Sequence, residues 1–136
     1  MREVEVSRFV RATPRELRRH LSPAAVVEAE DSFAVREVHD VDEGTLVTAG
    51  GGGLQLSLRF EPRDDGFYYT QEGQEGPFEA METWLTLASE DEGTRLTARS
   101  RVSLGLPLAA LTDWVAAWKR RGELDRALDN LAAAVE

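Results

Sequence analysis

The sequence predicts an α+β fold in which one antiparallel sheet is covered by a long C-terminal helix. The middle of the chain alternates apolar and polar residues between short turns, which is typical of strands with one buried face. The segment from Pro107 to Glu136 instead repeats apolar residues at helical spacing. The chain has 136 residues and no cysteine, so we expect one domain, residues 1–136, that folds without disulfide bonds.

The N-terminal segment predicts one strand followed by two short helices. In residues 4–12, Val4, Val6 and Val10 fall on one face with a period of two, as in a half-buried strand. Residues 13–16 (Thr-Pro-Arg-Glu) combine an N-cap, a proline at the first helical position and the glutamate of a capping box. Ser22-Pro23 is a second start of this kind and leads into a helix over residues 24–29.

The middle of the chain predicts six further strands. They are expected at residues 33–39, 45–49, 54–61, 67–71, 78–88 and 94–104. The turns between them are expected at residues 40–44, 50–53, 62–66, 73–77 and 89–93. Short turns make consecutive strands antiparallel. With the first strand this gives a seven-stranded sheet, and only the terminal helix is long enough to cover its apolar face.

The terminal helix carries two apolar stripes. The first consists of Leu108, Leu111, Trp114, Val115 and Trp118, and the second of Leu124, Leu128, Leu131 and Val135. At the rotation of an α-helix the two stripes are offset by roughly 110° around the axis. Gly122 lies at their junction, so either the helix kinks there, or its halves pack against different surfaces, or the glycine is tolerated in a gently wound helix.

The charge of the chain excludes several classes of partner. A net charge of −9 opposes binding to nucleic acids and to anionic membranes. Fifteen of the 16 basic residues are arginine, which suggests a halophile with a GC-rich genome or codon bias alone. No apolar run approaches the ~20 residues that span a bilayer, and the N-terminus lacks the regions of a signal peptide. We therefore expect a cytoplasmic protein without membrane insertion.

Three local segments carry a resemblance to a known superfamily: Val10-Arg11-Ala12-Thr13-Pro14, Gly93-Thr94-Arg95-Leu96-Thr97 and Ala127-Leu128-Asp129-Asn130-Leu131. With the element order of the whole chain, they resemble the helix-grip superfamily, often called SRPBCC. It includes START lipid-transfer domains, birch-pollen-allergen-like proteins and the polyketide cyclase/dehydrase family. The resemblance implies a strongly curved sheet around the long helix, with a cavity that binds lipids, polyketides or other hydrophobic molecules. Only some branches catalyse reactions, and no shared catalytic motif can be carried over.

The predicted ligand-binding residues are those that face this cavity by strand parity or helical spacing. They are Leu56, Leu58, Phe60, Tyr69, Met81, Thr83, Leu85, Ser100, Leu111, Trp114, Val115 and Trp118. Small-molecule sites are mostly apolar with a few placed polar groups, which the hydroxyl and indole N–H groups would supply. The alternative is that these side chains simply fill the core.

Neither a metal site nor a cofactor is expected. His20 and His39 lack the spacing of a zinc motif, and an exposed strand end is the favoured position for His39. The glycines at 50–53 lack the Gly-Lys-Ser/Thr ending of a phosphate-binding loop. Residues 40–44 resemble the start of a calcium loop, but Gly51 stands where its glutamate is required.

The arginines offer two further candidate features. Arg8 falls on the buried face of the first strand, where it either holds an acidic ligand in the cavity or reaches solvent past the sheet edge. Arg18-Arg19 and Lys119-Arg120-Arg121 are short basic patches that we expect to face water or to pair with nearby acids.

Three functions are compatible with these patterns. The leading hypothesis is a binding protein for a small hydrophobic molecule. The second is a cyclase/dehydrase-type enzyme that uses Glu37, His39, Glu79 or Arg8 as acid or base. The third is an interaction module with a collapsed cavity. The chain is expected to be a monomer or a homodimer, the latter through exposed Trp84 and Phe78.

Overall fold

The computed structural model describes residues 2–73, 78–104 and 109–136, with side chains from Asp113 onward in the last range. Its strands are β1 (Arg2–Val10), β2 (Ala34–Val41), β3 (Gly44–Gly51), β4 (Leu54–Arg63), β5 (Gly66–Glu72), β6 (Ala80–Glu90) and β7 (Gly93–Ser103). Its helices are α1 (Pro14–Arg18), α2 (Pro23–Glu30) and α3 (Ala109–Val135). The predicted order of elements and the α+β class are confirmed.

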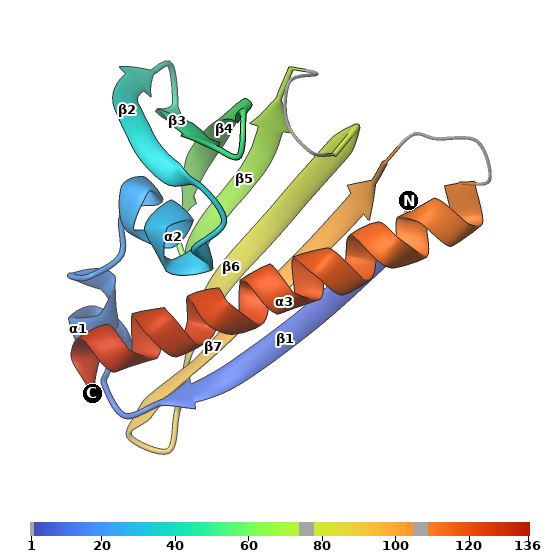
Figure 1. Cartoon of the computed structure of the whole chain (residues 1–136). Helices are drawn as coiled ribbons and strands as arrows, with labels where there is room; N and C mark the ends of the chain where they lie inside the picture. Colours follow the sequence, from blue (N-terminus) through green and yellow to red (C-terminus); the bar gives the residue numbers. More distant parts are fainter. Residues whose placement is uncertain (1, 74–77, 105–108) are drawn as a thin grey trace.

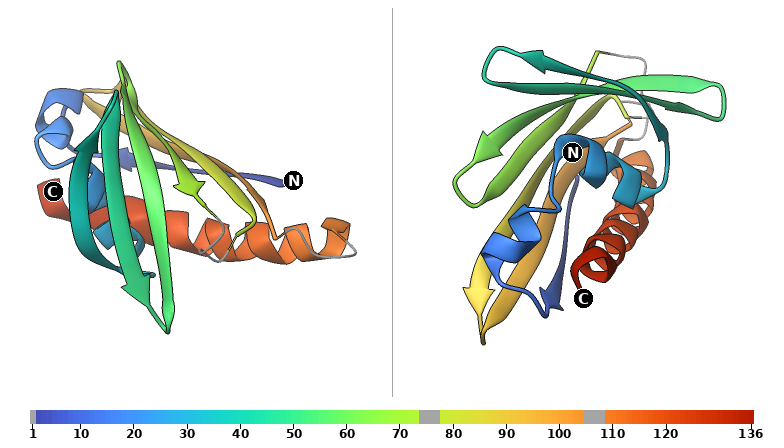
Figure 2. Two further views of the ribbon diagram at one scale, coloured as in Figure 1. Left: turned by 90° about the horizontal axis from the view of Figure 1, so that it is seen from above. Right: turned by 90° about the vertical axis from the view of Figure 1, so that its left-hand side faces the viewer.

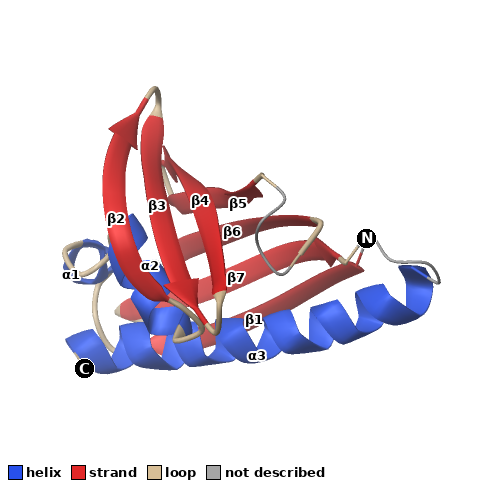
Figure 3. Cartoon of the chain, turned by 45° about the horizontal axis from the view of Figure 1, so that its top comes forward, coloured by secondary structure: helices blue, strands red, loops and turns tan. Residues whose placement is uncertain are grey.

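All seven strands form one antiparallel sheet in the order β1-β7-β6-β5-β4-β3-β2. Strands β2 to β7 follow one another as neighbours, and β1 returns to pair with β7 (Figure 1). The strands at the two ends of the sheet run in very different directions, so the sheet is strongly twisted and curved (Figure 2). Helix α3 lies along one face, where it packs on β1, β7 and α2 (Figure 3).

The two short helices begin at the predicted caps. The Thr13 hydroxyl accepts a hydrogen bond from the Glu16 backbone N–H, and the Glu16 carboxylate accepts one from the Thr13 backbone N–H, both at 3.2 Å. The Ser22 hydroxyl accepts from the Ala25 backbone N–H at 3.1 Å. These bonds satisfy N–H groups that have no partner in the first turn of a helix. Helix α2 ends at Glu30, where Asp31 adopts a left-handed conformation, and it packs on α3.

The strands bury the faces that their alternation predicts. On β4, Leu56, Leu58 and Phe60 are buried, whereas Leu54, next to the turn, is 46% exposed. The buried sets of β6 and β7 are Met81, Thr83, Leu85 and Leu87, and Leu96, Ala98, Ser100 and Val102. These side chains form the inner face of the sheet, on which α2 and α3 lie.

The turns predicted at residues 40–44, 50–53, 62–66 and 89–93 are all shorter in the structure, where two residues separate the strands in each case. Gly50 and Gly51 belong to β3, and the turn contains only Gly52 and Gly53, both with positive φ. Residues 62 and 63 continue β4, because pairing with β3 ends at Phe60 and a proline is tolerated where one side of a strand is unpaired. The turn predicted at residues 73–77 lies largely outside the described residues.

Helix α3 is continuous through Gly122, so the alternative of a tolerated glycine agrees with the structure. The second apolar stripe is buried at Leu124, Leu128 and Leu131. The first stripe was expected to face the sheet, and this prediction is wrong. Trp114 is 53% exposed, Val115 46% and Trp118 71%. Leu108 and the side chain of Leu111 lie outside the described residues.

Arg8 connects the first strand to the last helix. Its guanidinium donates to Asp129 at 2.7 Å and to Glu136 at 3.3 Å. The Arg11 backbone N–H donates to Glu136 at 3.1 Å. Arg8 is therefore used to hold the end of α3 against β1, and it does not line the pocket described below.

None of the described helices is long and apolar enough to cross a membrane. Within residues 2–73, 78–104 and 109–136, no group of three or more His, Asp or Glu side chains is arranged to hold a metal ion.

Candidate ligand pocket

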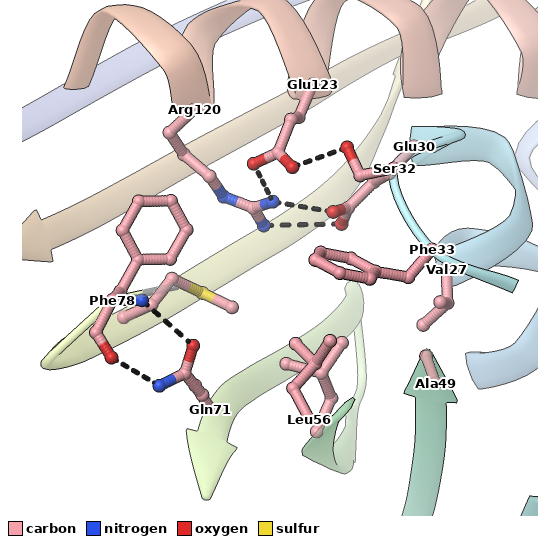
Figure 4. Close-up of a pocket in the computed structure, with 12 residues that line it drawn as sticks. Val27, Glu30, Ser32, Phe33, Ala49, Leu56, Gln71, Phe78, Arg120 and Glu123 are labelled. Atoms are coloured by element: carbon pink, nitrogen blue, oxygen red, sulfur yellow. Dashed lines mark hydrogen bonds and ion pairs between the residues drawn. The ribbon is translucent and has the colours of Figure 1, made fainter. Parts of the chain in front are cut away.

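A pocket lies between the inner face of the sheet, the end of α2 and the middle of α3 (Figure 4). Its apolar lining consists of Val27, Phe33, Ala49, Leu56, Leu58, Phe78 and Met81. Its polar lining consists of Glu30, Ser32, Gln71, Arg120 and Glu123. The pocket thus combines an apolar wall, supplied mainly by the strands, with a polar wall that α3 and the end of α2 supply.

The pocket is small. The centre of a water-sized molecule has about 20 Å³ in which to move inside it. That is enough for about one water molecule, whereas pockets for drug-sized ligands enclose roughly 300–1,000 Å³. A bulky ligand can therefore occupy this pocket only if lining side chains move.

Arg120 is the centre of the polar wall, and it is 1% exposed. Its Nη1 donates to Glu30 Oε1 at 2.6 Å and to Glu123 Oε1 at 3.3 Å. Its Nη2 donates to Glu30 Oε2 at 3.3 Å. Burying a cation is costly unless carboxylates and hydrogen bonds compensate for the lost water, and here one cation lies between two carboxylates.

Hydroxyl groups of the sheet complete the contacts of Arg120. Its Nη2 donates to Thr83 Oγ1 at 2.9 Å and to the Tyr69 hydroxyl at 3.0 Å, and its Nε donates to Ser100 Oγ at 3.3 Å. The Tyr69 hydroxyl in turn donates to Glu30 Oε2 at 2.6 Å. The guanidinium is thereby held in one orientation from β5, β6 and β7 as well as from α2.

Burial and the neighbouring charges shift the pKa values of this group. Burial alone would raise the pKa of Glu123, but the Arg120 guanidinium, the Ser32 hydroxyl and the Lys119 ammonium hold it below its ordinary value. Burial, reinforced by the Glu30 carboxylate, raises the pKa of the Tyr69 hydroxyl. Desolvation would lower the pKa of Arg120, but its acidic partners raise it, so the guanidinium stays charged.

Comparison with solved structures establishes the fold. TTHA0849 from Thermus thermophilus is 18% identical, with a TM-score of 0.68 over 99% of this chain and 100% of that one. The Zhui aromatase/cyclase from a Streptomyces species is 14% identical, with a TM-score of 0.72 over 98% and 93%. Ara h 8.0201 is 14% identical, with a TM-score of 0.60 over 97% and 98%. The chain has the helix-grip fold.

This result confirms, at the level of fold, the resemblance seen in the sequence. No family model matches the chain, and no curated protein is significantly similar to it in sequence. The helix-grip architecture accounts for the position of the pocket, because the curved sheet meets α2 and α3 on its inner face. The sequence identities are too low to carry a ligand or a reaction from these proteins to this chain.

The helix-grip pocket includes only some of the residues predicted to bind a ligand. Leu56, Leu58 and Met81 line it. Phe60 and Leu85 lie in the core, Phe60 stacked on Tyr69 at 4.3 Å between ring centroids. Tyr69, Thr83 and Ser100 lie behind the lining, where their hydroxyls contact Arg120. Trp114, Val115 and Trp118 lie on the outer, exposed face of α3.

Sequence reasoning missed the four residues of the polar wall: Glu30, Ser32, Arg120 and Glu123. Of the two alternatives given for Arg120, pairing with acids agrees with the structure, and the side chain is buried rather than in water. A signal was present in the helical spacing. Arg120 lies four residues before Leu124, and Ala116 and Ala117 lie one turn earlier, so one buried stripe runs through the arginine.

The acid and base candidates from the sequence lie elsewhere. Glu37, His39 and Glu79 are exposed, and His39 contacts Glu37 at 3.0 Å. The exposed position predicted for His39 is thus confirmed. The dimer surface was predicted as exposed Trp84 with Phe78. Trp84 is half-buried and Phe78 is buried in the pocket lining, so Phe78 is not part of an exposed surface.

Proposed function

We propose that this protein binds a small, mainly apolar molecule in the pocket between the sheet and α3. The observation that carries the proposal is the lining itself, in which seven apolar side chains face a buried group of charged and hydroxyl side chains. Sites for small molecules have this composition, because apolar contacts supply affinity and a few polar groups fix orientation. The helix-grip fold supports the proposal, and one protein that shares it is an aromatase/cyclase.

For a ligand to enter, the side chains of the apolar wall must rearrange. Met81 is an unbranched side chain that adapts to irregular shapes, and it lines the pocket together with Phe78 and Phe33. The polar wall is held by several hydrogen bonds and is expected to stay in place. The rigid polar wall would then orient the ligand, while the apolar wall adjusts to the shape of the ligand.

Binding is favoured over acid–base catalysis. Glu123 is the pocket carboxyl with a lowered pKa, and its charged neighbours keep it ionised at neutral pH. An efficient general acid or base needs a pKa near the working pH. The predicted acid and base residues do not line the pocket, so binding without chemistry agrees best with the residues present.

The small volume of the pocket favours one rival function, an interaction module whose cavity is filled by its own side chains. The two functions differ in their response to small molecules. A binding protein is stabilised by its ligand, whereas a module with a permanently collapsed cavity is not. The single-domain organisation, the cytoplasmic location and the oligomeric state stay predictions from the sequence.

The test measures binding by native mass spectrometry and by thermal shift. The probes are neutral, mainly apolar molecules of increasing size: hexanol, naphthol and a sterol. Ala49→Leu fills the pocket, and Ala34→Leu makes the same change at an exposed site on β2. We expect Ala49→Leu to weaken binding by about tenfold or more, with Ala34→Leu unchanged.

Met81→Ala provides an independent variant, because it enlarges the pocket. We expect it to bind naphthol more tightly than the wild type. Absence of any bound species and of any thermal shift, in both the wild type and Met81→Ala, would overturn the proposal and favour the interaction module.

A further inference from the structure

The donors of the polar wall are all engaged. A guanidinium has five N–H groups, one on Nε and two on each terminal nitrogen. In Arg120, Nε points to Ser100, the Nη1 pair points to Glu30 and Glu123, and the Nη2 pair is shared among Glu30, Tyr69 and Thr83. Arg120 therefore lies in the pocket wall with each N–H directed at a protein oxygen, and none is left for a ligand.

The acceptors of the wall are only partly engaged. An ionised carboxylate has about four acceptor positions, two on each oxygen. Among the described residues, Oε1 of Glu30 and Oε1 of Glu123 each accept one bond, both from Arg120. Oε2 of Glu30 accepts from Tyr69 and Arg120, and Oε2 of Glu123 accepts from Ser32 and Lys119. Each carboxylate thus retains one acceptor position, on Oε1.

The neutral polar residues of the lining, Ser32 and Gln71, do not reverse this excess of free acceptors over free donors. The Ser32 hydroxyl donates to Glu123 at 2.5 Å and accepts from Arg126 at 3.2 Å, so its single hydrogen is used. Gln71 binds the backbone N–H and C=O of Phe78, which leaves one amide N–H. Figure 4 places Gln71 beside Phe78, apart from the charged group on α2 and α3.

The net charge of the polar wall also favours a ligand that donates hydrogen bonds over an anionic ligand. Glu30 and Glu123 carry two negative charges against the single positive charge of Arg120, so the buried group has one net negative charge. Lys119 contacts Glu123 at 3.3 Å, but its side chain is 50% exposed and does not line the pocket. A buried ligand carboxylate would meet this negative charge without a guanidinium donor, whereas a ligand O–H or N–H would meet a carboxylate oxygen.

We infer that the ligand is an apolar molecule with a hydrogen-bond donor, as an alcohol, a phenol or an amine, and that the pocket discriminates against carboxylic acids. The inference rests on the proposed function and adds the chemical class of the ligand to it. It separates this pocket from one built for fatty acids, which would need a free cationic donor among its lining residues.

The test compares four probes with one naphthalene body: 2-naphthol, 2-naphthylmethylamine, 2-methylnaphthalene and 2-naphthoate. Dissociation constants are measured by calorimetry at pH 7 on the wild type and on Met81→Ala. We expect the phenol and the amine to bind about tenfold or more tightly than the methyl compound and the carboxylate. A carboxylate that binds as tightly as the amine, or a methyl compound that binds as tightly as the phenol, overturns the inference and leaves the proposed function standing.

If none of the four probes binds to either protein, and neither hexanol nor the sterol shifts the melting temperature, the proposed function is overturned and the inference with it. The two failures are therefore distinguishable by whether the methyl compound and the carboxylate bind.

A pair of variants locates the discrimination. Glu123→Gln removes one buried negative charge and adds an amide donor to the wall. Asp125→Asn makes the same change of net charge two residues away, at an exposed position of α3. We expect Glu123→Gln to narrow the preference for the amine over the carboxylate by about fivefold or more, and Asp125→Asn to leave it unchanged. Equal changes in both variants would assign the discrimination to the overall charge of the protein and overturn the inference.

Discussion

The two ends of α3 differ in which kind of residue they bury. Toward its C-terminus, the buried face consists of leucines and alanines, including Leu124, Leu128 and Leu131. Toward its N-terminus, the buried face consists of Asp113, Ala116, Ala117 and Arg120, while two tryptophans are exposed. In α3, the position of a residue around the helix decides whether it is buried, and the polarity of its side chain does not. The chain leaves its largest apolar side chains in solvent where they fall outside the buried stripe.

Two polar residues of the buried face meet the pocket. Arg120 and Glu123 line it, whereas the leucines that follow lie in the core against β1, β7 and α2. One helix therefore supplies both a packing surface and a polar wall. Substitutions along α3 can separate these two roles.

Loss of Arg120 is expected to have the largest effect. Arg120→Met leaves Glu30 and Glu123 buried without their cation, so we expect the free energy of unfolding to fall by about 3–5 kcal/mol. Arg121→Met, at the next and exposed position, is expected to change it by less than about 0.5 kcal/mol. Urea denaturation measures both, and equal losses would show that Arg120 is not part of a buried network.

Truncation of an apolar side chain tests the two ends of α3 directly. We expect Leu128→Ala to cost about 2–5 kcal/mol, because it leaves a cavity between α3 and the sheet. Trp118→Ala removes a larger side chain but is expected to change stability by less than about 0.5 kcal/mol, since Trp118 is 71% exposed. A loss at Trp118 as large as that at Leu128 would reverse the assignment of buried and exposed faces.

The Tyr69 hydroxyl is the next target. Tyr69→Phe removes the group that donates to Glu30 and accepts from Arg120, and we expect a loss of about 1–3 kcal/mol. Tyr68→Phe is the control, because the Tyr68 hydroxyl donates to Glu82 at a partly exposed site, and its loss should be smaller. Thermal denaturation of the two variants gives the order, and a larger loss for Tyr68→Phe would contradict the network.

The smallest expected effect is a change in pH dependence. Because folding lowers the pKa of Glu123, the folded state favours the ionised carboxylate, and this stabilisation is present above the ordinary glutamate pKa of about 4.3. It is lost as the pH falls through the lower pKa of the folded state. Glu123→Gln should therefore lose less stability than the wild type on acidification from pH 6, and Asp125→Asn should not differ from the wild type. Parallel curves for Glu123→Gln and the wild type would contradict the lowered pKa.

The elements could be predicted because they depend on local patterns. The caps at Thr13 and Ser22 and the alternation in β4 involve residues within a few positions of one another. Turn lengths depend on strand pairing, which the local sequence does not show. The turn predicted at residues 50–53 is therefore too long, because Gly50 pairs with Ala34 and with Gln55, and Gly51 pairs with Leu54.

The site could be predicted only in its apolar part. Leu56, Leu58 and Met81 follow from strand parity, since a buried face is apolar. The charged wall depends on an ion pair between residues 90 positions apart, Glu30 and Arg120. No local pattern shows that these two side chains meet, and an arginine without a known partner is expected in solvent.

The contact between β1 and the end of α3 has a consequence for biosynthesis. Arg8 and Asp129 are separated by 121 positions, and β1 has β7 as its strand partner. At roughly 5–20 residues per second, the ribosome needs on the order of ten seconds to deliver the far side of this contact after the near side has emerged. For most of that interval, until β7 (Gly93–Ser103) has been made, the first strand has no native strand neighbour, and its contact with α3 forms later still.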